Sequence, residues 1–267
     1  MSEREFSPSE ALSRIENIIS SLSLTFTAQH ADSSKLVATA ELFDKNNNLV
    51  DSGAGKGPDS LIGALAESIE HLSASQHIPD NITVKHCTFI AKQKAAKHDG
   101  FLNNLSSRDD AIDTFKLTTL DNSKAIFVPS LLLCPGAIDA PSSNVVLSSQ
   151  FLSRYSSNSG TAFGCTQPEA LLHGIHEIIE RHTLSCFFMA ICAFGPTMKL
   201  YAPSKALLAA SLKNNPSALA LADKLQIIII KDLMNVFFSV ALPKKGPGHF
   251  HLSPIGSGCS LDICTAV

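Results

Sequence analysis

The sequence predicts an α+β fold, in which mixed or antiparallel sheets are packed with helices. Three observations point to this class: amphipathic helical stripes, pairs of short strand-like runs between them, and a β-branched run at 227–230 that is typical of a strand buried on both faces. Strand pairs that alternate with single helices are characteristic of sheets covered by helical layers.

The N-terminal part of the chain is predicted to form a helical segment over residues 1–34, followed by one domain over 35–267. Apolar residues recur at helical spacing over 8–22, and Ser7 and Pro8 provide a cap and a first-turn proline. This pattern predicts a single amphipathic helix near the N-terminus.

The first part of the domain is predicted to contain two strands and a helix. Residues 36–43 and those around 49–50 have strand character, and the turn-forming residues 44–48 join them. Helical periodicity follows over 60–75, and the apolar run at 82–90 predicts another strand.

The middle of the domain is predicted to contain a hairpin. Residues 115–120 and 125–128 form its strands, and residues 131–134 are expected to extend the sheet. The polar stretch 98–113 predicts a loop or a short helix, and the serine-rich stretch 142–159 predicts a loop.

The last third is predicted to contain short helices followed by a strand pair. The helices are expected over 204–212 and 217–224. The strand at 227–230 is expected to pair with 236–242.

Composition and charge exclude several classes of protein. With 267 residues, 45% hydrophobic and 17% charged, the chain is long enough for an ample core. A net charge of −3 without a basic stripe gives no reason to expect nucleic acid, and no apolar run predicts a membrane span. Seven cysteines without a Cys-x-x-Cys pair, and an N-terminus without a secretory signal, predict a cytoplasmic protein.

Five carboxylates on two helical segments are the most informative feature of the chain. The first segment carries Glu67 and Glu70. The second segment carries three glutamates and one arginine on one side of the helix. Their angles around the helix axis are about 0° for Glu169, 20° for Glu180, 80° for Glu177 and 120° for Arg181. The apolar side chains on the opposite arc, Leu171, Leu172, Ile175, Ile178 and Ile179, are expected to be buried.

Two interpretations of these carboxylates are open. Each helix can simply be amphipathic, with a solvated acidic face. However, only Glu177 has a basic residue four places later, in Arg181, so the other carboxylates lack the usual partner. Carboxylates are ligands that Mg²⁺ prefers, often together with nucleotide phosphates, and an arginine can hold a phosphate with two hydrogen bonds. The pattern therefore predicts a magnesium–nucleotide site.

The order of these motifs resembles the ATP-binding signature of the YcaO family. Beyond the two acidic segments, Lys56 lies in a Gly-Lys-Gly triplet before the first, and residues 158–164 resemble the entry to the second. Residues 256–262 resemble a glycine-rich stretch that precedes a third helix in the family. The resemblance extends from about residue 35 to the C-terminus.

The resemblance implies an ATP- and Mg²⁺-dependent enzyme that phosphorylates a backbone amide oxygen of a peptide or protein, in the cyclodehydratase and thioamidation class. It implies that all five glutamates bind Mg²⁺, that Lys56 and Arg181 contact the nucleotide, and that Asn158 or Ser159 does so too. It leaves the catalytic residues unknown. Implied partners are a peptide or protein substrate, a protein that delivers it, and a second copy of the chain in a homodimer.

The end of the chain at Val267 leads to the expectation of a C-terminal truncation. Ser260 or Asp262 is expected to cap a helix, of which only about one turn is present. The alternative function is therefore a truncated, non-catalytic scaffold or peptide-binding partner. A metal-dependent hydrolase that uses the glutamates is a third possibility.

Two further patterns have ordinary structural explanations. His176 and Glu177 resemble part of a zinc-protease motif, but Glu180 replaces its second histidine. The pair of His173 and Glu177 is still able to bind a metal. Residues 243–251 contain two lysines and two histidines, so a basic anion site and a surface turn are both open, and a surface turn is expected.

Overall fold

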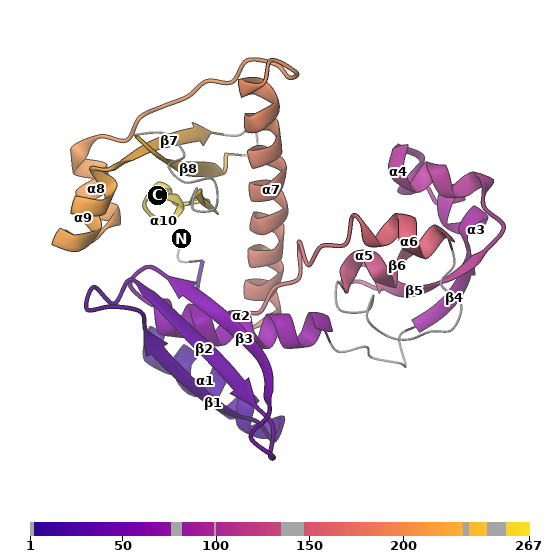
Figure 1. Cartoon of the computed structure of the whole chain (residues 1–267), viewed down its shortest axis with the longest axis horizontal. Helices are drawn as coiled ribbons and strands as arrows, with labels where there is room; N and C mark the ends of the chain where they lie inside the picture. Colours follow the sequence, from indigo (N-terminus) through magenta and orange to yellow (C-terminus); the bar gives the residue numbers. More distant parts are fainter. Residues whose placement is uncertain (1–2, 76–81, 99, 135–146, 232–234, 245–254) are drawn as a thin grey trace. The chain divides into compact units, whose positions relative to one another are not determined.

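The computed structural model describes residues 3–75, 82–98, 100–134, 147–231, 235–244 and 255–267. The chain forms two compact units, each of which is described by itself. The first unit comprises Met1–Ile69 and Ala162–Val267, and the second comprises Glu70–Thr161. Helices and small antiparallel sheets make up both units, so the predicted α+β class is confirmed (Figure 1).

The first unit begins with a three-stranded antiparallel sheet and two helices. These elements are α1 (Pro8–Ser21), β1 (Thr25–His30), β2 (Val37–Phe43), β3 (Leu49–Lys56) and α2 (Ser60–Ser75), of which the residues from Glu70 onward are assigned to the second unit. The strand order is β1-β2-β3. The predicted helices and strand pair are confirmed, but β1 lies within the predicted N-terminal helical segment and pairs with β2 across residue 34. The domain boundary at residue 34 stays a prediction.

Small side chains allow α2 to lie directly on β3. In the antiparallel register, Gly53 is opposite Ala40 and Gly55 is opposite Ala38, so all four residues share one face of the sheet. A Cβ atom at Gly55 would collide with the carbonyl oxygen of Ser60, and one at Gly53 would collide with the backbone of α2. The helix and the strand consequently approach at backbone distance.

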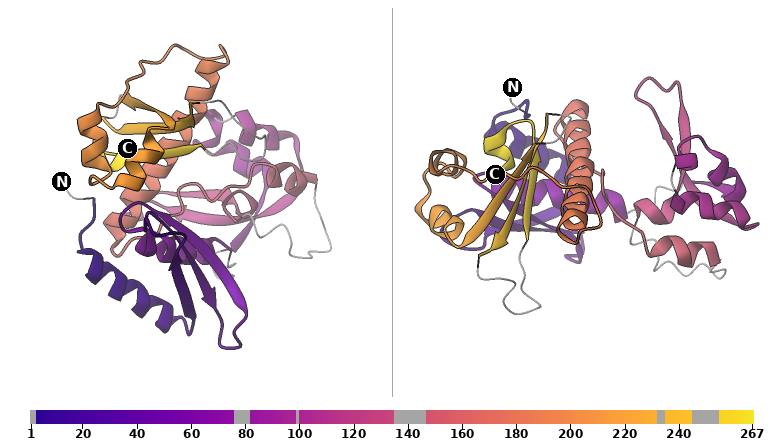
Figure 2. Two further views of the ribbon diagram at one scale, coloured as in Figure 1. Left: turned by 60° about the vertical axis from the view of Figure 1, so that its left-hand side comes forward. Right: turned by 90° about the horizontal axis from the view of Figure 1, so that it is seen from above.

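The rest of the first unit is a second three-stranded antiparallel sheet between helices. Its elements are α7 (Gln167–Ile191), α8 (Lys205–Ser211), α9 (Pro216–Ala222), β7 (Leu225–Lys231), β8 (Phe237–Pro243), β9 (Gly256–Ser260) and α10 (Ile263–Ala266). Figure 2 shows α7 on one face of this sheet and the shorter helices on the other. Phe187 of α7 is buried against Ile230, Phe238 and Val240, which fixes the long helix to the sheet.

The last residues form a strand and one helical turn. The predicted glycine-rich stretch is β9, which pairs with β8. Asp262, rather than Ser260, caps the final turn, because its carboxylate accepts a hydrogen bond from the backbone N–H of Thr265 at 2.9 Å. Among the described residues, no helix is both long and apolar enough to cross a membrane.

The second unit contains a third antiparallel sheet, in the order β4-β5-β6. Its strands and principal helices are β4 (Ile82–His86), α3 (Cys87–Lys92), α4 (Gly100–Asn103), β5 (Ala111–Thr118), β6 (Ala125–Pro129), α5 (Ser130–Leu133) and α6 (Leu147–Ser153). Short 3₁₀ turns, Ala96–His98 and Asn104–Ser107, lie on either side of α4.

Three sequence predictions are wrong in the second unit. The predicted strand 82–90 changes to a helix at Cys87, because Cys87, Ile90 and Ala91 form one buried side of a helical turn. Residues 130–133 are helical rather than a strand, and α6 lies within the serine-rich stretch that was expected to be a loop. Leu152 of α6 belongs to the core and half-buried Phe151 packs against it, so the helix is held by apolar contacts that the serine-rich composition did not indicate.

We predict that Gly55→Ala destabilises the protein by about 2 kcal/mol or more, because the added methyl group forces α2 away from β3. Chemical denaturation of the full chain measures the change in the free energy of unfolding. Gly256→Ala is the matched control, since a Cβ there would stand 3.9 Å from the Cβ of Ala241, at ordinary contact distance. Equal stability of wild type and Gly55→Ala would contradict the close packing of α2 on β3.

Candidate functional site

Helix α7 begins with a reciprocal cap that involves the first predicted carboxylate. Thr166 accepts a hydrogen bond from the backbone N–H of Glu169 at 3.3 Å, and Glu169 accepts one from the backbone N–H of Cys165 at 3.1 Å. Both bonds satisfy donors near the start of the helix. Glu169 thus has a structural role in addition to any role in binding.

The buried face of α7 differs from the face predicted from the sequence. The buried residues are Gly174, His176, Ile179, Thr183 and Phe187. Leu171, Ile175 and Ile178 were expected to be buried but are 43%, 43% and 54% exposed. The prediction was wrong for these three, and the carboxylates on the other arc are half-buried.

The C-terminal half of α7 explains this orientation. On the angular scale that places Glu169 at 0°, Phe187 falls at about 0° and Leu184 at about 60°. Both side chains pack on the sheet of β7 and β8. Because Glu180 falls between them at about 20°, this packing turns its carboxylate toward the sheet.

A chain of hydrogen bonds joins Glu180 to Lys56 through Ser257. The hydroxyl of Ser257 donates to Oε1 of Glu180 at 2.7 Å. The ammonium of Lys56 donates to the backbone carbonyl oxygen of Ser257, also at 2.7 Å. The predicted nucleotide-binding lysine on β3 and the predicted metal ligand on α7 are therefore held by one residue of β9.

Glu67 lies at the free edge of β3. Its carboxylate accepts a hydrogen bond from the backbone N–H of Ala54 at 2.8 Å. In the order β1-β2-β3, β3 is an edge strand, and an unpaired edge N–H needs such a partner. Lys56 follows Ala54 by two residues, so the same strand holds Glu67 and presents Lys56 toward β9.

Arg181 forms an ion pair with Glu177 one turn away. Its Nε and Nη2 atoms donate to Oε1 of Glu177 at 3.1 and 2.8 Å. The arginine side chain is 55% exposed, so this pair is a surface interaction worth about 0.3–0.5 kcal/mol. A guanidinium held this weakly can turn toward a phosphate at little cost.

The spacing along α7 limits how the glutamates can share metal ions. With a rise of 1.5 Å per residue, Glu169 and Glu180 are about 16 Å apart along the axis, whereas Glu177 and Glu180 are about 4.5 Å apart. Within the described part of the chain, no three His, Cys, Asp or Glu side chains converge as a metal-binding group. Ligation by the whole set stays a prediction, and it requires more than one ion.

The chemistry of the donors nevertheless fits Mg²⁺ and a triphosphate. Carboxylate oxygens are hard ligands, and Lys56 and Arg181 supply positive charge for phosphate. Among the described residues, neither Glu169 nor Glu180 has a cationic partner. Their charge is therefore not compensated within the described structure.

Three predicted residues belong to the second unit. Glu70 lies one helical turn after Glu67 on α2. Asn158 and Ser159 lie in a turn, where the Asn158 carbonyl accepts from the N–H of Thr161 at 2.9 Å and the hydroxyls of Ser159 and Ser157 are 2.6 Å apart. Their contacts with nucleotide stay predictions.

Sequence reasoning missed two residues near the site, Ser257 and Glu3. Ser257 lies in a glycine-rich stretch that drew attention only for its glycines. Glu3 accepts hydrogen bonds from the Ser260 hydroxyl at 2.6 Å and the Leu261 N–H at 2.8 Å. Buried His176 also lies 3.9 Å from the Glu3 carboxylate. No local pattern indicates a contact between residues more than 250 positions apart.

Cys165 lies beside Glu169, where a thiol would be a candidate nucleophile. Burial raises the pKa of the Cys165 thiol, the Glu169 carboxylate raises it further, and Arg14 and Arg4 oppose the increase. The thiol therefore stays protonated near neutral pH, which disfavours nucleophilic attack by this residue.

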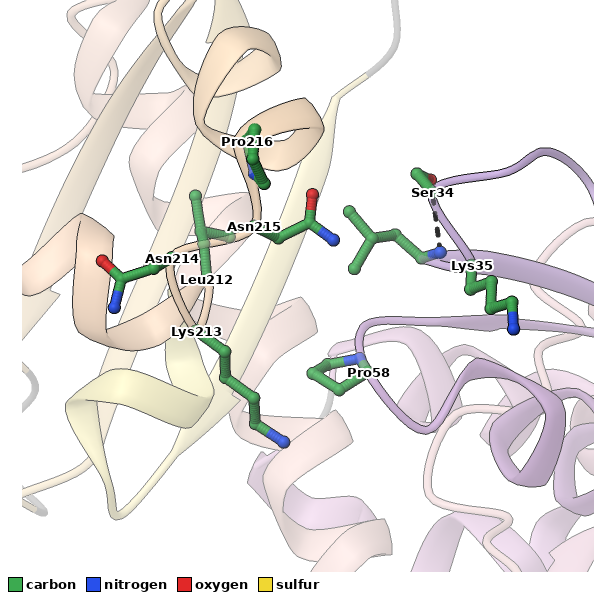
Figure 3. A pocket seen from close by; sticks show the side chains of 9 residues that line it. Ser34, Lys35, Pro58, Leu212, Lys213, Asn214, Asn215 and Pro216 are labelled. Atoms are coloured by element: carbon green, nitrogen blue, oxygen red, sulfur yellow. Dashed lines mark hydrogen bonds between the residues drawn. The ribbon is translucent and has the colours of Figure 1, made fainter.

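A separate cleft of about 430 Å³ lies elsewhere in the first unit. Figure 3 shows its wall of α8–α9 loop residues opposite Ser34, Lys35 and Pro58. None of the predicted site residues lines it, and its two lysines are both exposed. This cleft is therefore distinct from the residues that join β3, β9 and α7.

Comparisons with known proteins agree with the predicted family. The family profile described as YcaO cyclodehydratase, binding ATP and Mg²⁺, matches residues 53–267. No curated protein matches the chain. Two solved structures share the fold: YcaO from Methanopyrus kandleri bound with AMPPCP and Mg²⁺, and a heterocyclase in complex with substrate and cofactor.

These structural likenesses extend over nearly the whole chain but only part of each relative. The Methanopyrus protein has a TM-score of 0.61 and 14% identity, over 98% of this chain and 64% of its own. The heterocyclase has a TM-score of 0.65 and 16% identity, over 99% of this chain and 39% of its own. Since the family profile covers most of the chain and describes ATP and Mg²⁺ as ligands, this protein belongs to the YcaO family.

Proposed function

We propose that this chain binds Mg²⁺ and ATP and uses them to activate a backbone amide of a peptide or protein. The observation that supports this most directly is the pair of hydrogen bonds at Ser257. They hold Lys56 of β3 and Glu180 of α7 beside the same residue of β9. The Methanopyrus relative was solved with AMPPCP and Mg²⁺, and the heterocyclase with substrate and cofactor. The outcome of activation is a heterocycle or a thioamide.

The residues of the proposed site divide into phosphate-binding cations and metal-binding carboxylates. ATP with Mg²⁺ supplies the phosphoryl group that converts the amide oxygen into a leaving group. Lys56 and Arg181 bind and orient phosphate oxygens. Glu67 and Glu180, together with the other three glutamates, hold the metal ions. Such a site acts by positioning and charge neutralisation, because phosphoryl transfer requires little covalent chemistry from the protein.

The substrate and partners follow from the same proposal. The substrate is a peptide or protein whose backbone amide reaches the bound nucleotide, and delivery by a partner protein and assembly as a homodimer are part of the proposal. A nucleic acid is not among the proposed partners, because the net charge is −3 and the sequence has no basic stripe.

We predict that AMPPCP with Mg²⁺ binds the full chain, and that Glu67→Gln and Glu180→Gln each lower the affinity by about tenfold or more. A charge-assisted contact is worth about 1.5–3 kcal/mol, and 1.4 kcal/mol corresponds to a factor of ten. Isothermal titration calorimetry measures the affinity. At ligand concentrations one hundred times Kd, the stability should rise by about 2.7 kcal/mol.

Glu16→Gln is the matched control, since Glu16 is an exposed helical glutamate on α1. It should bind the nucleotide as the wild type does. Absence of binding to the wild-type chain, or equal affinity of all four proteins, would show that the proposed nucleotide site is wrong.

Arg181→Ala should separate the binding role of this arginine from its structural role. We expect the free energy of unfolding to change by at most about 0.5 kcal/mol, because the pair with Glu177 is exposed. Affinity for AMPPCP with Mg²⁺ should fall by about tenfold. The affinity of Arg181→Lys should fall between those of the wild type and Arg181→Ala, since lysine keeps the charge but lacks the planar fork of the guanidinium.

Arg154 provides a control for nonspecific loss of positive charge, because it is exposed and lies in the second unit. Arg154→Ala should leave nucleotide affinity unchanged. If Arg181→Ala binds as tightly as Arg154→Ala, Arg181 does not contact the phosphates.

A further inference from the structure

Two serines of β9, Ser257 and Ser260, each donate their side-chain hydroxyl to a glutamate of another segment. Ser257 donates its hydroxyl to Glu180 on α7 at 2.7 Å, and Ser260 donates its hydroxyl to Glu3 at 2.6 Å. Only the first of these glutamates belongs to the proposed metal ligands. Ser257 therefore contacts a proposed metal ligand, and Ser260 of the same strand provides a control that does not.

Ser257 engages two groups of opposite charge at once. Its hydroxyl donates to the Glu180 carboxylate, and its carbonyl oxygen accepts from the Lys56 ammonium. On its other side, β9 is paired with β8, where Ser257 is opposite Val240. The residue is thus held in place by the sheet while it contacts both charged side chains.

Neither contact compensates the charge of its partner. A hydroxyl orients a carboxylate without adding a positive charge, and a carbonyl oxygen orients an ammonium without adding a negative one. Among the described residues, Glu180 has no cationic partner and Lys56 has no anionic one. If the two side chains paired directly, each would lose the charge that it offers to a ligand.

We propose that Ser257 is a positioning residue that holds Glu180 and Lys56 apart, so that the carboxylate is available to Mg²⁺ and the ammonium to the triphosphate. This inference rests on the proposed function and adds to it the residue that organises its charges. It predicts that loss of the hydroxyl lets Glu180 turn toward Lys56. The resulting ion pair would then compete with both the metal and the phosphate.

The central experiment measures binding of AMPPCP by calorimetry over a series of Mg²⁺ concentrations. Ser257→Ala should lower the affinity by about tenfold and raise the Mg²⁺ concentration needed for half-maximal binding. Ser257→Thr, which keeps the hydroxyl, should restore both quantities to within about threefold of the wild type. Ser260→Ala should also bind within about threefold of the wild type, since its hydroxyl contacts Glu3.

A double-mutant comparison tests whether Lys56 is the competitor. Lys56→Met alone should weaken nucleotide binding. When Ser257→Ala is added to Lys56→Met, the Mg²⁺ concentration needed for half-maximal binding should rise less than when Ser257→Ala is added to the wild type. Ser257→Cys gives a second variant of similar size with a weak donor, should Ser257→Ala fail to fold. Chemical denaturation of each variant confirms that a folded protein is being compared.

The outcomes distinguish this inference from the proposed function. If the wild type binds AMPPCP and Mg²⁺ while Ser257→Ala and Ser257→Cys bind equally well, the positioning role is wrong and the function stands. If Ser260→Ala loses as much affinity as Ser257→Ala, the effect comes from the strand in general, and the inference is overturned. If the wild type does not bind the nucleotide, both fail together.

Discussion

The rotation of α7 about its own axis is the constraint on which the proposed site depends. Phe187 is buried against β7 and β8, and Leu184 packs beside it. A straight helix has one rotation for its whole length, so these contacts also set the direction of every carboxylate toward its N-terminal end. The position of Glu180 near Ser257 follows from packing two turns away.

A second constraint comes from the close approach of α2 to β3. Gly53 and Gly55 have no side chain between the strand and the helix, so Glu67 of α2 can reach the backbone of Ala54. Larger residues on this face would improve apolar burial but move the carboxylate away from the strand edge. The glycines therefore serve the geometry of the site as well as the packing of the layer.

Neutral groups orient the charged side chains of the site. An amide N–H holds Glu67, a hydroxyl holds Glu180 and a carbonyl oxygen holds Lys56. A direct ion pair between Glu180 and Lys56 would stabilise both side chains, but it would reduce the charge that each offers to a ligand. Arg181 and Glu177, which are both proposed ligands, do form an ion pair, and the pair is weak enough to exchange because the arginine is exposed.

The sequence by itself determined the fold class and most helices and strands, because periodicity and caps are local properties. It did not distinguish strand from helix after His86, since short apolar runs satisfy both patterns. It also assigned burial to Leu171, Ile175 and Ile178, whereas packing of the distant half of α7 leaves them exposed.

Tertiary structure alone decided the partners of the site residues. The contacts of Ser257 with Glu180 and Lys56 join segments 77 and 201 positions apart, and those of Glu3 reach 257 and 258 positions along the chain. Periodicity describes which side of an element a residue occupies, but not which other element faces it. That choice depends on how helices and sheets fill the core together, and hence on the whole set of packing contacts.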